Sequence, residues 1–570
     1  MSRRWHLPCM DEKSNNFRPV LILGAGINGC ALARELLLNN VPVCLVDQRD
    51  IASGATAYSS RLIHGGLRYL EYGEFDLVRE SLAERTRLLR LAPHLVKPLR
   101  LSIPTTNRFG GFVTSALRFI GWRWWPAGLP GQQRGLAMVR LGLNLYDAYA
   151  RDPLLPRHSV ARVTESPLPV DRSKYRWLCT YYDAQVPYPE RLTLAMLRDA
   201  QELSKSSGVP LCVLTYHEAH LDGDLVRVTS RGDASVSEQF KPIAVVNATG
   251  AWVDRSLQRL EVPSELLIGG TKGSHLVTFH AGLRAALGDQ GIYAEAGDGR
   301  PVFIMPLGDA CLIGTTDIPW QQCPDEARAT ADEVEYLLDA VRTVLPDLRL
   351  SKTDVDFHYS GVRPLPYADQ ERPAGITRRH FLVRHEHAPL PVYSIVGGKL
   401  TTCRSLAQTA AAQILSDLGH ETPATSEARV FPGGEDYPQD EQALTQVLQR
   451  LAQESRWSLE SVKAIWQLHG SSTFEIVRKL SSELQGMIPD TVFPVSFVRW
   501  TIQNEWVRTL DDLVERRLML LYHQRLTRAC LAALAELLVR EQHRAASEIA
   551  PMVASTAGRL SERYGKQVVD

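Results

Sequence analysis

The chain has 570 residues and a formal net charge of zero, with 44% hydrophobic and 22% charged residues. One hydrophobic core rarely extends over so long a chain, so two or three domains of ordinary globular composition are expected. A neutral balance gives no support to nucleic-acid binding, so no nucleic-acid partner is expected. Any anion must then be bound by a local cluster of cations.

The nine cysteines are scattered along the chain, and no two of them form a C-x-x-C pair. This spacing argues against a disulfide framework and against a zinc site, so no metal is expected and a reducing compartment is favoured. No apolar run reaches the roughly 18 residues of a membrane-spanning helix, and the first residues lack the apolar core of a secretory signal. We therefore expect a cytoplasmic protein, one that is still able to lie against a membrane.

In chain order, residues 1–17 form a polar extension, and residues 18–49 have the pattern of strand, glycine turn, helix and strand. The middle of the chain mixes helical stretches with short β-rich runs such as Val302–Met305 and Cys311–Gly314. This alternation predicts an α/β body with an interleaved β-rich portion.

A cluster of proline and glycine at residues 430–434 marks a boundary. Beyond it, apolar residues recur every three to four positions in Ala443–Leu468 and Ser496–Arg540, which predicts helices. The predicted fold is therefore of mixed α/β class. Its three parts are an extension (1–17), a Rossmann-like dinucleotide-binding body with an interleaved substrate domain (18–428) and a helical C-terminal domain (429–570).

A dinucleotide fingerprint follows the first strand, where Gly24, Gly26 and Gly29 form a G-x-G-x-x-G turn before a helix. Gly24 permits the tight turn, Gly26 lets the backbone approach a pyrophosphate, and Gly29 allows close packing of helix and strand. The pyrophosphate is then expected at the helix N-terminus. Asp47 ends the second strand, at the distance where an acid hydrogen-bonds a ribose hydroxyl. The motif does not by itself distinguish NAD from FAD.

The segment Asn247–Trp252 contains an Ala-Thr-Gly sequence directly after the apolar strand 243–246. It resembles the segment of flavoproteins with two dinucleotide-binding domains in which the chain returns beneath FAD. In combination with the fingerprint, Thr249 and Gly250 therefore favour FAD as the cofactor.

The segment Ser59–Glu71, SSRLIHGGLRYLE, is long and specific. It resembles the flavin-contacting segment of the FAD-dependent, quinone-linked glycerol-3-phosphate dehydrogenases. Further segments agree with this family in order and spacing: Lys272–His275, Gly314–Asp317, Gly361–Leu365, Ile376–Arg378, Gly397–Thr402 and, near the C-terminus, Glu505–Arg508 with Asp511, Asp512, Arg516 and Arg517. Three positions depart from the family: Arg61 replaces a usual lysine, Ala251 a proline and Cys403 a tyrosine.

The resemblance implies oxidation of sn-glycerol 3-phosphate to dihydroxyacetone phosphate, with a hydride passing from carbon 2 to FAD and the electrons then to a quinone. It also implies a set of cofactor-binding residues beyond the fingerprint. These are Asn28, Ser59, Ser60, Leu62, His64, Gly66, Thr249, Gly250, Gly398, Lys399, Leu400 and Thr401.

A phosphate dianion needs several fixed cations, and the planar guanidinium group of arginine suits its oxygens. Four candidates lie in apolar or glycine-rich settings that are unusual for surface charges: Arg68, Arg363, Arg378 and Lys399. The resemblance places them around the substrate, with Tyr69 and Thr315 as further hydrogen-bond donors.

Hydride transfer also requires loss of the hydroxyl proton, and His64 and His275 are the natural bases. Either could instead be a packing histidine, and Arg363 could share the role by polarising the hydroxyl. The turn before Thr402–Leu415 is expected to direct Lys399 and a helix N-terminus at the flavin's pyrimidine edge. A simple capping role for Thr401 or Thr402 is the alternative.

The segment Asn107–Arg140 is the least family-like part, with three tryptophans interleaved among arginines and aliphatic residues. This composition suits docking on an anionic lipid surface, and packing against the protein itself is an equal alternative. The family resemblance favours docking and implies peripheral binding at the inner face of the cell membrane. Three other functions are alternatives: an oxidase of the same fold that uses oxygen, an amino-acid or 2-hydroxy-acid oxidase of the glycine-oxidase type, and an inactive FAD-binding scaffold. The second would need one carboxylate-binding arginine and not a cluster, and the presence of Arg68, Arg363, Arg378 and Lys399 together argues against the third. A homodimer is a further possibility.

Overall fold

The computed structural model describes residues 18–108, 135–368, 378–421, 424–480 and 486–570. The extension 1–17 and most of the segment proposed for membrane docking lie outside the described residues, as does the side chain of Arg68.

A six-stranded sheet in the order β18-β19-β11-β1-β2-β7 forms the first half of the body. Its strands are β1 (Val20–Leu23), β2 (Val43–Asp47), β7 (Leu211–Thr215), β11 (Ala244–Asn247), β18 (Phe381–His385) and β19 (Val392–Val396). All neighbours pair in parallel except the edge pair β18 and β19. The predicted unit over residues 18–49 is present as β1, helix α1 (Ile27–Leu38) and β2.

Each residue of β1 packs on one of two faces of this sheet. Val20 and Ile22 contribute to the hydrophobic cluster that includes α1, whereas Leu21 and Leu23 join residues of an antiparallel sheet on the other side. The period of two follows from strand geometry, and burial on both faces explains the continuous apolar run. The helical layer contains α1, α5 (Pro189–Ser207) and α9 (Cys403–Asp417); the opposite layer contains β8 (His217–Asp222), β9 (Leu225–Ser230), β10 (Ser237–Phe240) and α6 (Val253–Arg259).

A second, larger sheet forms the other half of the body and is mostly antiparallel. Its strands are β3 (Leu62–Ile63), β4 (Lys97–Thr105), β5 (Ser159–Arg162), β6 (Trp177–Gln185), β12 (Thr271–Thr278), β13 (Gln290–Glu295), β14 (Pro301–Leu307), β15 (Ala310–Gly314), β16 (Ile318–Pro319) and β17 (Phe357–Arg363). The two short β-rich runs predicted from the sequence lie in β14 and β15, so both are confirmed. Helices α7 (Ala281–Leu287) and α8 (Ala331–Val344) pack on one face, and α2 (Phe75–Leu91) and α4 (Leu136–Ala150) on the other.

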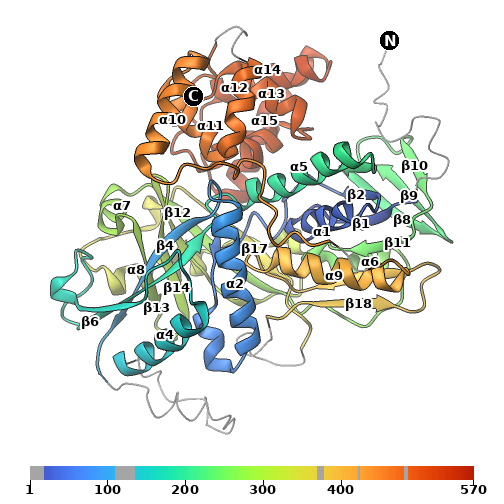
Figure 1. Ribbon diagram of the computed structural model, residues 1–570. Coiled ribbons are helices and arrows are strands. Elements are labelled where there is room, and N and C mark those ends of the chain that lie inside the picture. The colour runs from blue at the N-terminus through green and yellow to red at the C-terminus, as the bar shows by residue number, and fades with distance from the viewer. Residues whose placement is uncertain (1–17, 109–134, 369–377, 422–423, 481–485) are drawn as a thin grey trace.

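From residue 441 the described chain is helical, with α10 (Glu441–Ser455), α11 (Leu459–His469), α12 (Thr473–Leu480), α13 (Val495–Asn504), a π-helical turn (Asp512–Arg517), α14 (Arg528–Glu541) and α15 (Ile549–Tyr564). These helices gather above the body, from orange to red in Figure 1. The two predicted helical stretches are interrupted where Arg456, Trp506 and Met519 adopt left-handed backbone angles, each shortly after the end of a helical segment. The division into domains at residue 428 stays a prediction.

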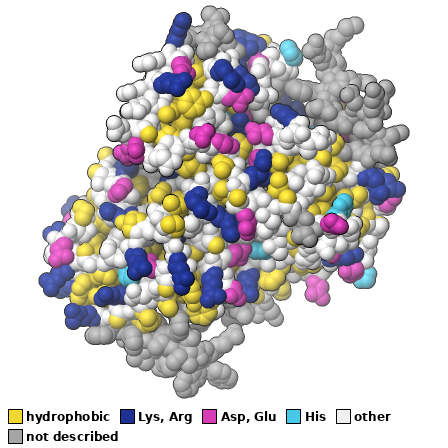
Figure 2. Space-filling view, viewed as in Figure 1, with side chains coloured by type: hydrophobic (Ala, Val, Ile, Leu, Met, Phe, Trp, Pro, Cys, Tyr) yellow, Lys and Arg dark blue, Asp and Glu magenta, His cyan; other side chains and the backbone are white. Residues whose placement is uncertain are grey.

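Hydrophobic, basic and acidic side chains are interspersed over the face shown in Figure 2, as a neutral net charge allows. Among the described residues, none of the helices has both the length and the apolar character needed to cross a membrane.

Candidate active site

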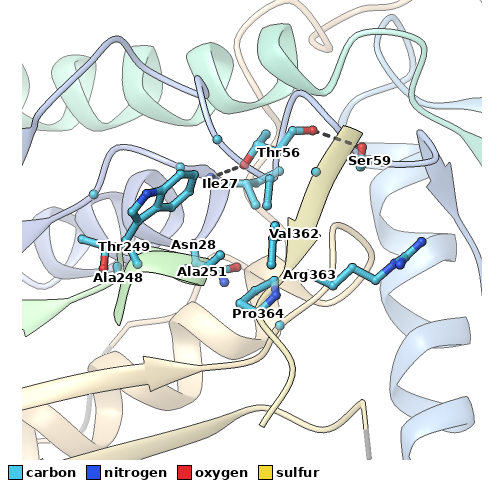
Figure 3. Close-up of a pocket in the computed structure, with 18 of the residues that line it drawn as sticks. Ile27, Asn28, Thr56, Ser59, Ala248, Thr249, Ala251, Val362, Arg363 and Pro364 are labelled. Atoms are coloured by element: carbon cyan, nitrogen blue, oxygen red, sulfur yellow. Dashed lines mark hydrogen bonds between the residues drawn. The ribbon is translucent and has the colours of Figure 1, made fainter. Parts of the chain in front are cut away.

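A cavity of about 310 Å³ opens at the carboxyl end of β1, between the two sheets of the body. Its walls are the glycine turn after β1, the segment from Asp47 to Leu62, the end of β11 and the turn before α9. The end of β17 closes it from the larger sheet, where Val362, Arg363 and Pro364 lie opposite Asn28 and Thr249 (Figure 3). Strand β1 pairs with β2 on one side and β11 on the other, so this is the switch point of the parallel sheet, where ligands of such sheets bind.

The three glycines of the fingerprint each meet a different steric demand. Gly24 has a φ of +102°, and a Cβ there would lie 2.7 Å from the carbonyl oxygen of Ala248. A Cβ at Gly29 would lie 1.9 Å from the carbonyl oxygen of Gly24, so the helix can approach the turn only without a side chain. At Gly26 the nearest atom is 3.5 Å away, on Thr56, which leaves the cavity side of the backbone open to a ligand.

Asp47 braces this turn while its carboxylate faces the cavity. Its two oxygens accept hydrogen bonds from the amides of Ala25 at 2.7 Å and Arg49 at 2.8 Å. Burial raises the pKa of Asp47 to about 6. The carboxylate therefore both fixes the turn and lies where a ribose hydroxyl can donate to it.

The amide end of α1 is tied to the segment that follows β2. The amide of Ile27 donates to Thr56 Oγ1 at 3.1 Å, and the Ser59 hydroxyl donates to the Thr56 carbonyl at 3.0 Å (Figure 3). Asn28 donates from Nδ2 to the Gly397 carbonyl at 3.5 Å, whereas its Oδ1 is buried without a partner among the described residues. Such an unpartnered polar atom in a cavity wall indicates that a polar ligand completes the site.

The turn before α9 contacts the segment that contains His64. Thr401 Oγ1 accepts a hydrogen bond from the His64 amide at 3.1 Å. Thr402 is the residue at the helix N-cap, and its side chain makes no capping bond. Thr401 therefore ties two cavity walls together, and the alternative of a simple helix-capping role for Thr402 has no support. Gly398, with a φ of +102°, lies so close to Asn28 that a Cβ would be 2.6 Å from its Nδ2.

Lys399 projects its ammonium group over the ring of Tyr69, with Nζ 3.8 Å from the ring centroid. The Nζ atom is buried and has no hydrogen-bond partner among the described residues. Burial, followed by the positive charge of Arg378, lowers the pKa of Lys399 to about 7. A cation–π contact satisfies only part of an ammonium's demand for acceptors, so an anion in the cavity would be bound strongly here.

Arg363 is held in place by a set of acceptors at the end of β17. Its Nη1 lies 3.0 Å from Asp317 Oδ1, and its Nη2 donates to Thr315 Oγ1 at 2.8 Å and to the Thr316 carbonyl at 3.1 Å. Arg378 approaches the other oxygen of Asp317 at 3.6 Å. Asp317 thus orients both guanidinium groups, a role that its place at the end of the Gly314–Asp317 segment does not indicate.

Both candidate bases line the cavity and are uncharged. Burial lowers the pKa of His64 to about 4, and burial together with Arg363 and Arg61 lowers the pKa of His275 well below its ordinary value. His275 shares a 2.9 Å hydrogen bond between Nε2 and the Ser60 hydroxyl, and its Nδ1 has no partner among the described residues. At neutral pH each imidazole is therefore uncharged and can accept a hydrogen bond at a ring nitrogen, while burial makes it a weaker base than a free histidine.

The structure brings most of the predicted site residues to this one cavity. The lining includes Gly24, Gly26, Asn28, Asp47, Ser59, Ser60, Leu62, His64, Tyr69, Thr249, Gly250, His275, Arg363, Arg378, Gly398, Lys399, Leu400 and Thr401. Three predicted residues stand behind the wall: Gly29 packs on the turn, Gly66 on the ring of Tyr69, and Thr315 on Arg363. The side chain of Arg68 lies outside the described residues.

Arg61, the departure from a usual lysine, has a structural role beside the cavity. Its side chain is fully buried, pairs with Glu190 at 2.8 Å and donates to the hydroxyl of Tyr522 in the C-terminal region. The guanidinium group also donates to the carbonyl of Ala57 at 3.2 Å. Lysine could not make all of these bonds from one ammonium group.

Four features together indicate that this protein binds a dinucleotide at the switch point of its parallel sheet. They are the glycine turn, the N-terminus of α1, Asp47 at the end of β2 and the segment that contains Thr249. The unpartnered Asn28 Oδ1 can accept a hydrogen bond from such a ligand, and the unpartnered Lys399 Nζ can donate to its anionic oxygens. Residues 19–404 match the family model described as FAD dependent oxidoreductase. The class is therefore that of FAD-dependent oxidoreductases, and FAD is the cofactor.

Named relatives narrow this class. The chain is 33% identical to a glycerol-3-phosphate dehydrogenase of Synechocystis, over 89% of each chain. It is 30% identical to the aerobic glycerol-3-phosphate dehydrogenase of Escherichia coli, over 88% of this chain and 93% of that protein. The FAD complex of the glycerol-3-phosphate dehydrogenase from Bacillus halodurans has the same fold, with a TM-score of 0.72, 21% identity and 97% of each chain covered. The chain belongs to the glycerol-3-phosphate dehydrogenase family.

Proposed function

We propose that this protein oxidises sn-glycerol 3-phosphate to dihydroxyacetone phosphate. When bound, FAD supplies the acceptor for the hydride that leaves carbon 2. The observation that carries the substrate assignment is the cluster of cations in the cavity: Lys399, whose Nζ has no hydrogen-bond partner among the described residues, beside Arg363 and Arg378. The names of the relatives support the same substrate.

The chain's own residues would hold the two ligands in different ways. The dinucleotide is held at the glycine turn and α1, by Asp47, and by the walls that contain Thr249 and Thr401. The phosphate of the substrate is bound by Lys399 and the two arginines, with Tyr69 as a hydrogen-bond donor. Asp317 keeps the guanidinium groups from turning away, and Thr315 does the same from the other side of Arg363.

The hydroxyl proton needs an acceptor, and the two neutral imidazoles are the candidates. His275 is fixed by the Ser60 hydroxyl and stacks on Tyr359 with ring centroids 4.9 Å apart. His64 bonds to Thr401 through its backbone amide and carbonyl, and its ring centroid lies 6.2 Å from that of Tyr69. Asparagine at each position in turn distinguishes them, because loss of the base should lower kcat by about 100-fold or more, whereas loss of a packing histidine should not.

The electrons are proposed to pass on to a quinone, and the protein to bind peripherally at the inner face of the cell membrane from the cytoplasm. Support comes from the family resemblance and from the tryptophan and arginine content of residues 107–140. Binding to anionic liposomes, with a variant lacking residues 110–130 as the control, tests the membrane part. A homodimer is part of the same proposal, and sedimentation of the purified protein tests it.

The deciding experiment is anaerobic addition of glycerol 3-phosphate to the purified, yellow protein. Bleaching of the visible flavin absorbance is expected, with glycerol as the control that lacks a phosphate. A flavin that stays oxidised would refute the substrate assignment. Dye reduction compared with oxygen consumption and peroxide release then separates a quinone-linked dehydrogenase from an oxidase.

A further inference from the structure

The segment from Asp47 to Leu62 has two faces. Arg49, Thr56 and Ser59 on this segment line the cofactor cavity. Asp50 points the other way and is fully buried, in contact with the C-terminal region. The segment also passes beneath the amide end of α1, where Ala52 donates from its amide to the Ala25 carbonyl at 2.9 Å. Its position therefore determines the shape of the cofactor wall.

Asp50 is paired with two adjacent arginines of the π-helical turn in the C-terminal region. Its Oδ2 accepts from Arg516 Nε at 2.6 Å and from Arg517 Nη1 at 2.7 Å, and its Oδ1 accepts from Arg517 Nη2 at 2.7 Å. The side chains are at most 4% exposed. Arg516 and Arg517 belong to the C-terminal segment that resembles the glycerol-3-phosphate dehydrogenase family. Neither arginine has a role in the proposed chemistry.

The same turn holds a second wall of the cavity. Asp512 accepts a hydrogen bond from the Tyr216 hydroxyl at 2.6 Å, and it also pairs with Arg516 at 3.1 Å. The amide of Tyr216 in turn donates to the Arg49 carbonyl at 3.2 Å, and the next residue, His217, lines the cavity. Two cofactor-facing stretches, distant in sequence, are therefore fixed by one group of buried charges at the π-helical turn.

Both arginines also donate hydrogen bonds to acceptors within the C-terminal region. Arg517 donates from Nε to the Glu505 carbonyl at 2.7 Å, and Arg516 donates to Glu515 at 2.8 Å. Burial alone would raise the pKa of Asp50, but the two guanidinium groups outweigh it and the pKa is lowered. Buried charges of this kind specify one arrangement more than they add stability, because any other arrangement leaves a charge without its partner.

We propose that the C-terminal helical region is a positioning element of the cofactor site, and that the Asp50 pair with Arg516 and Arg517 sets the position of the FAD-lining segment. Asp50 and the arginines touch neither cofactor nor substrate in this proposal, so they are positioning residues and not catalytic ones. The proposal rests on FAD occupying the cavity described above, and not on the identity of the substrate.

The test measures FAD binding directly, by titrating the flavin-free protein with FAD and following the change in flavin fluorescence. In Asp50→Asn, and in the milder Arg517→Lys, FAD is expected to bind about tenfold more weakly or worse, as happens when outer-shell partners of a site are lost. The KM for glycerol 3-phosphate at saturating FAD is expected to stay within about twofold, because no substrate contact is changed.

Asp199→Asn is the matched control. Asp199 is 2% exposed and, like Asp50, pairs with two arginines, Arg34 at 2.5 Å and Arg429 at 2.6 Å, but none of the three lines the cavity. This variant should lower the unfolding temperature while FAD binds as before. Unchanged FAD affinity in the Asp50 and Arg517 variants would overturn the proposal, as would an equal loss of affinity in the control. If Asp50→Asn does not fold, Arg517→Lys gives the same readings. If glycerol 3-phosphate proves not to be the substrate, weaker FAD binding in the Asp50 and Arg517 variants would still support the positioning role.

Discussion

The unusual protonation of Lys399 gives a quantitative prediction about phosphate binding. Because the pKa of Lys399 is about 7, roughly nine tenths of its side chains are neutral at pH 8. A phosphate ester is a dianion above pH 7, since its second pKa is about 6. Its binding should draw a proton onto Lys399, about 0.9 per site at pH 8, and the Kd should rise by up to about tenfold per pH unit above 7.

The assay is calorimetric titration of the oxidised FAD-loaded protein with dihydroxyacetone phosphate, which cannot reduce the flavin. Repeating it in buffers of different ionisation enthalpy gives the number of protons taken up. Lys399→Arg keeps a permanent charge and should show a Kd that is flat from pH 7 to 9. Lys399→Met should bind about 10- to 100-fold more weakly at pH 7, since a charged hydrogen bond of about 1.5–3 kcal/mol is lost. Equal proton uptake in Lys399→Met would refute the reasoning.

Three further predictions concern stability. Gly29→Ala should lower the free energy of unfolding by about 1–3 kcal/mol and release flavin, because its Cβ would lie 1.9 Å from the carbonyl oxygen of Gly24. Gly142→Ala in α4 is the control that should be tolerated, because the nearest atom to its Cβ would be 3.7 Å away. Urea unfolding and flavin absorbance are measured for both variants. Arg61→Met should lower the free energy of unfolding by about 3–5 kcal/mol, and adding Glu190→Gln should restore part of it in a double-mutant cycle. Below pH 6.5 the unfolded chain protonates at His275 and the folded chain does not, so the free energy of unfolding should fall by up to about 1.4 kcal/mol per pH unit, a slope that His275→Asn should reduce.

The cofactor half of the site was predictable because its signals are local. Strand, glycine turn, helix and terminal acid follow one another within residues 20–47, and each has a steric or electrostatic reason that one sequence displays. The predicted strands in the middle of the chain were found for the same reason, since alternation and turn residues are local features.

The partners of buried charges could not be predicted, because pairing depends on the folded arrangement. Asp317 stands in a segment that was singled out, yet nothing in its spacing indicated that it would bridge Arg363 and Arg378. Likewise, the sequence does not indicate which acid pairs with Arg516 and Arg517, because Asp50 lies at the other end of the chain. The breaks within the C-terminal helices were missed because apolar periodicity continues across residues whose backbone turns left-handed.

The ion pair between Asp50 and Arg517 joins residues 467 positions apart, which has a consequence for the order of events during synthesis. At about 5–20 residues per second, a ribosome needs roughly half a minute or more to travel from the first partner to the second. During that interval the glycine turn and α1 can already form, since their contacts are local. A nascent chain that ends before residue 517 should therefore bind FAD weakly. Tight FAD binding should begin only when the last helices have emerged from the ribosome.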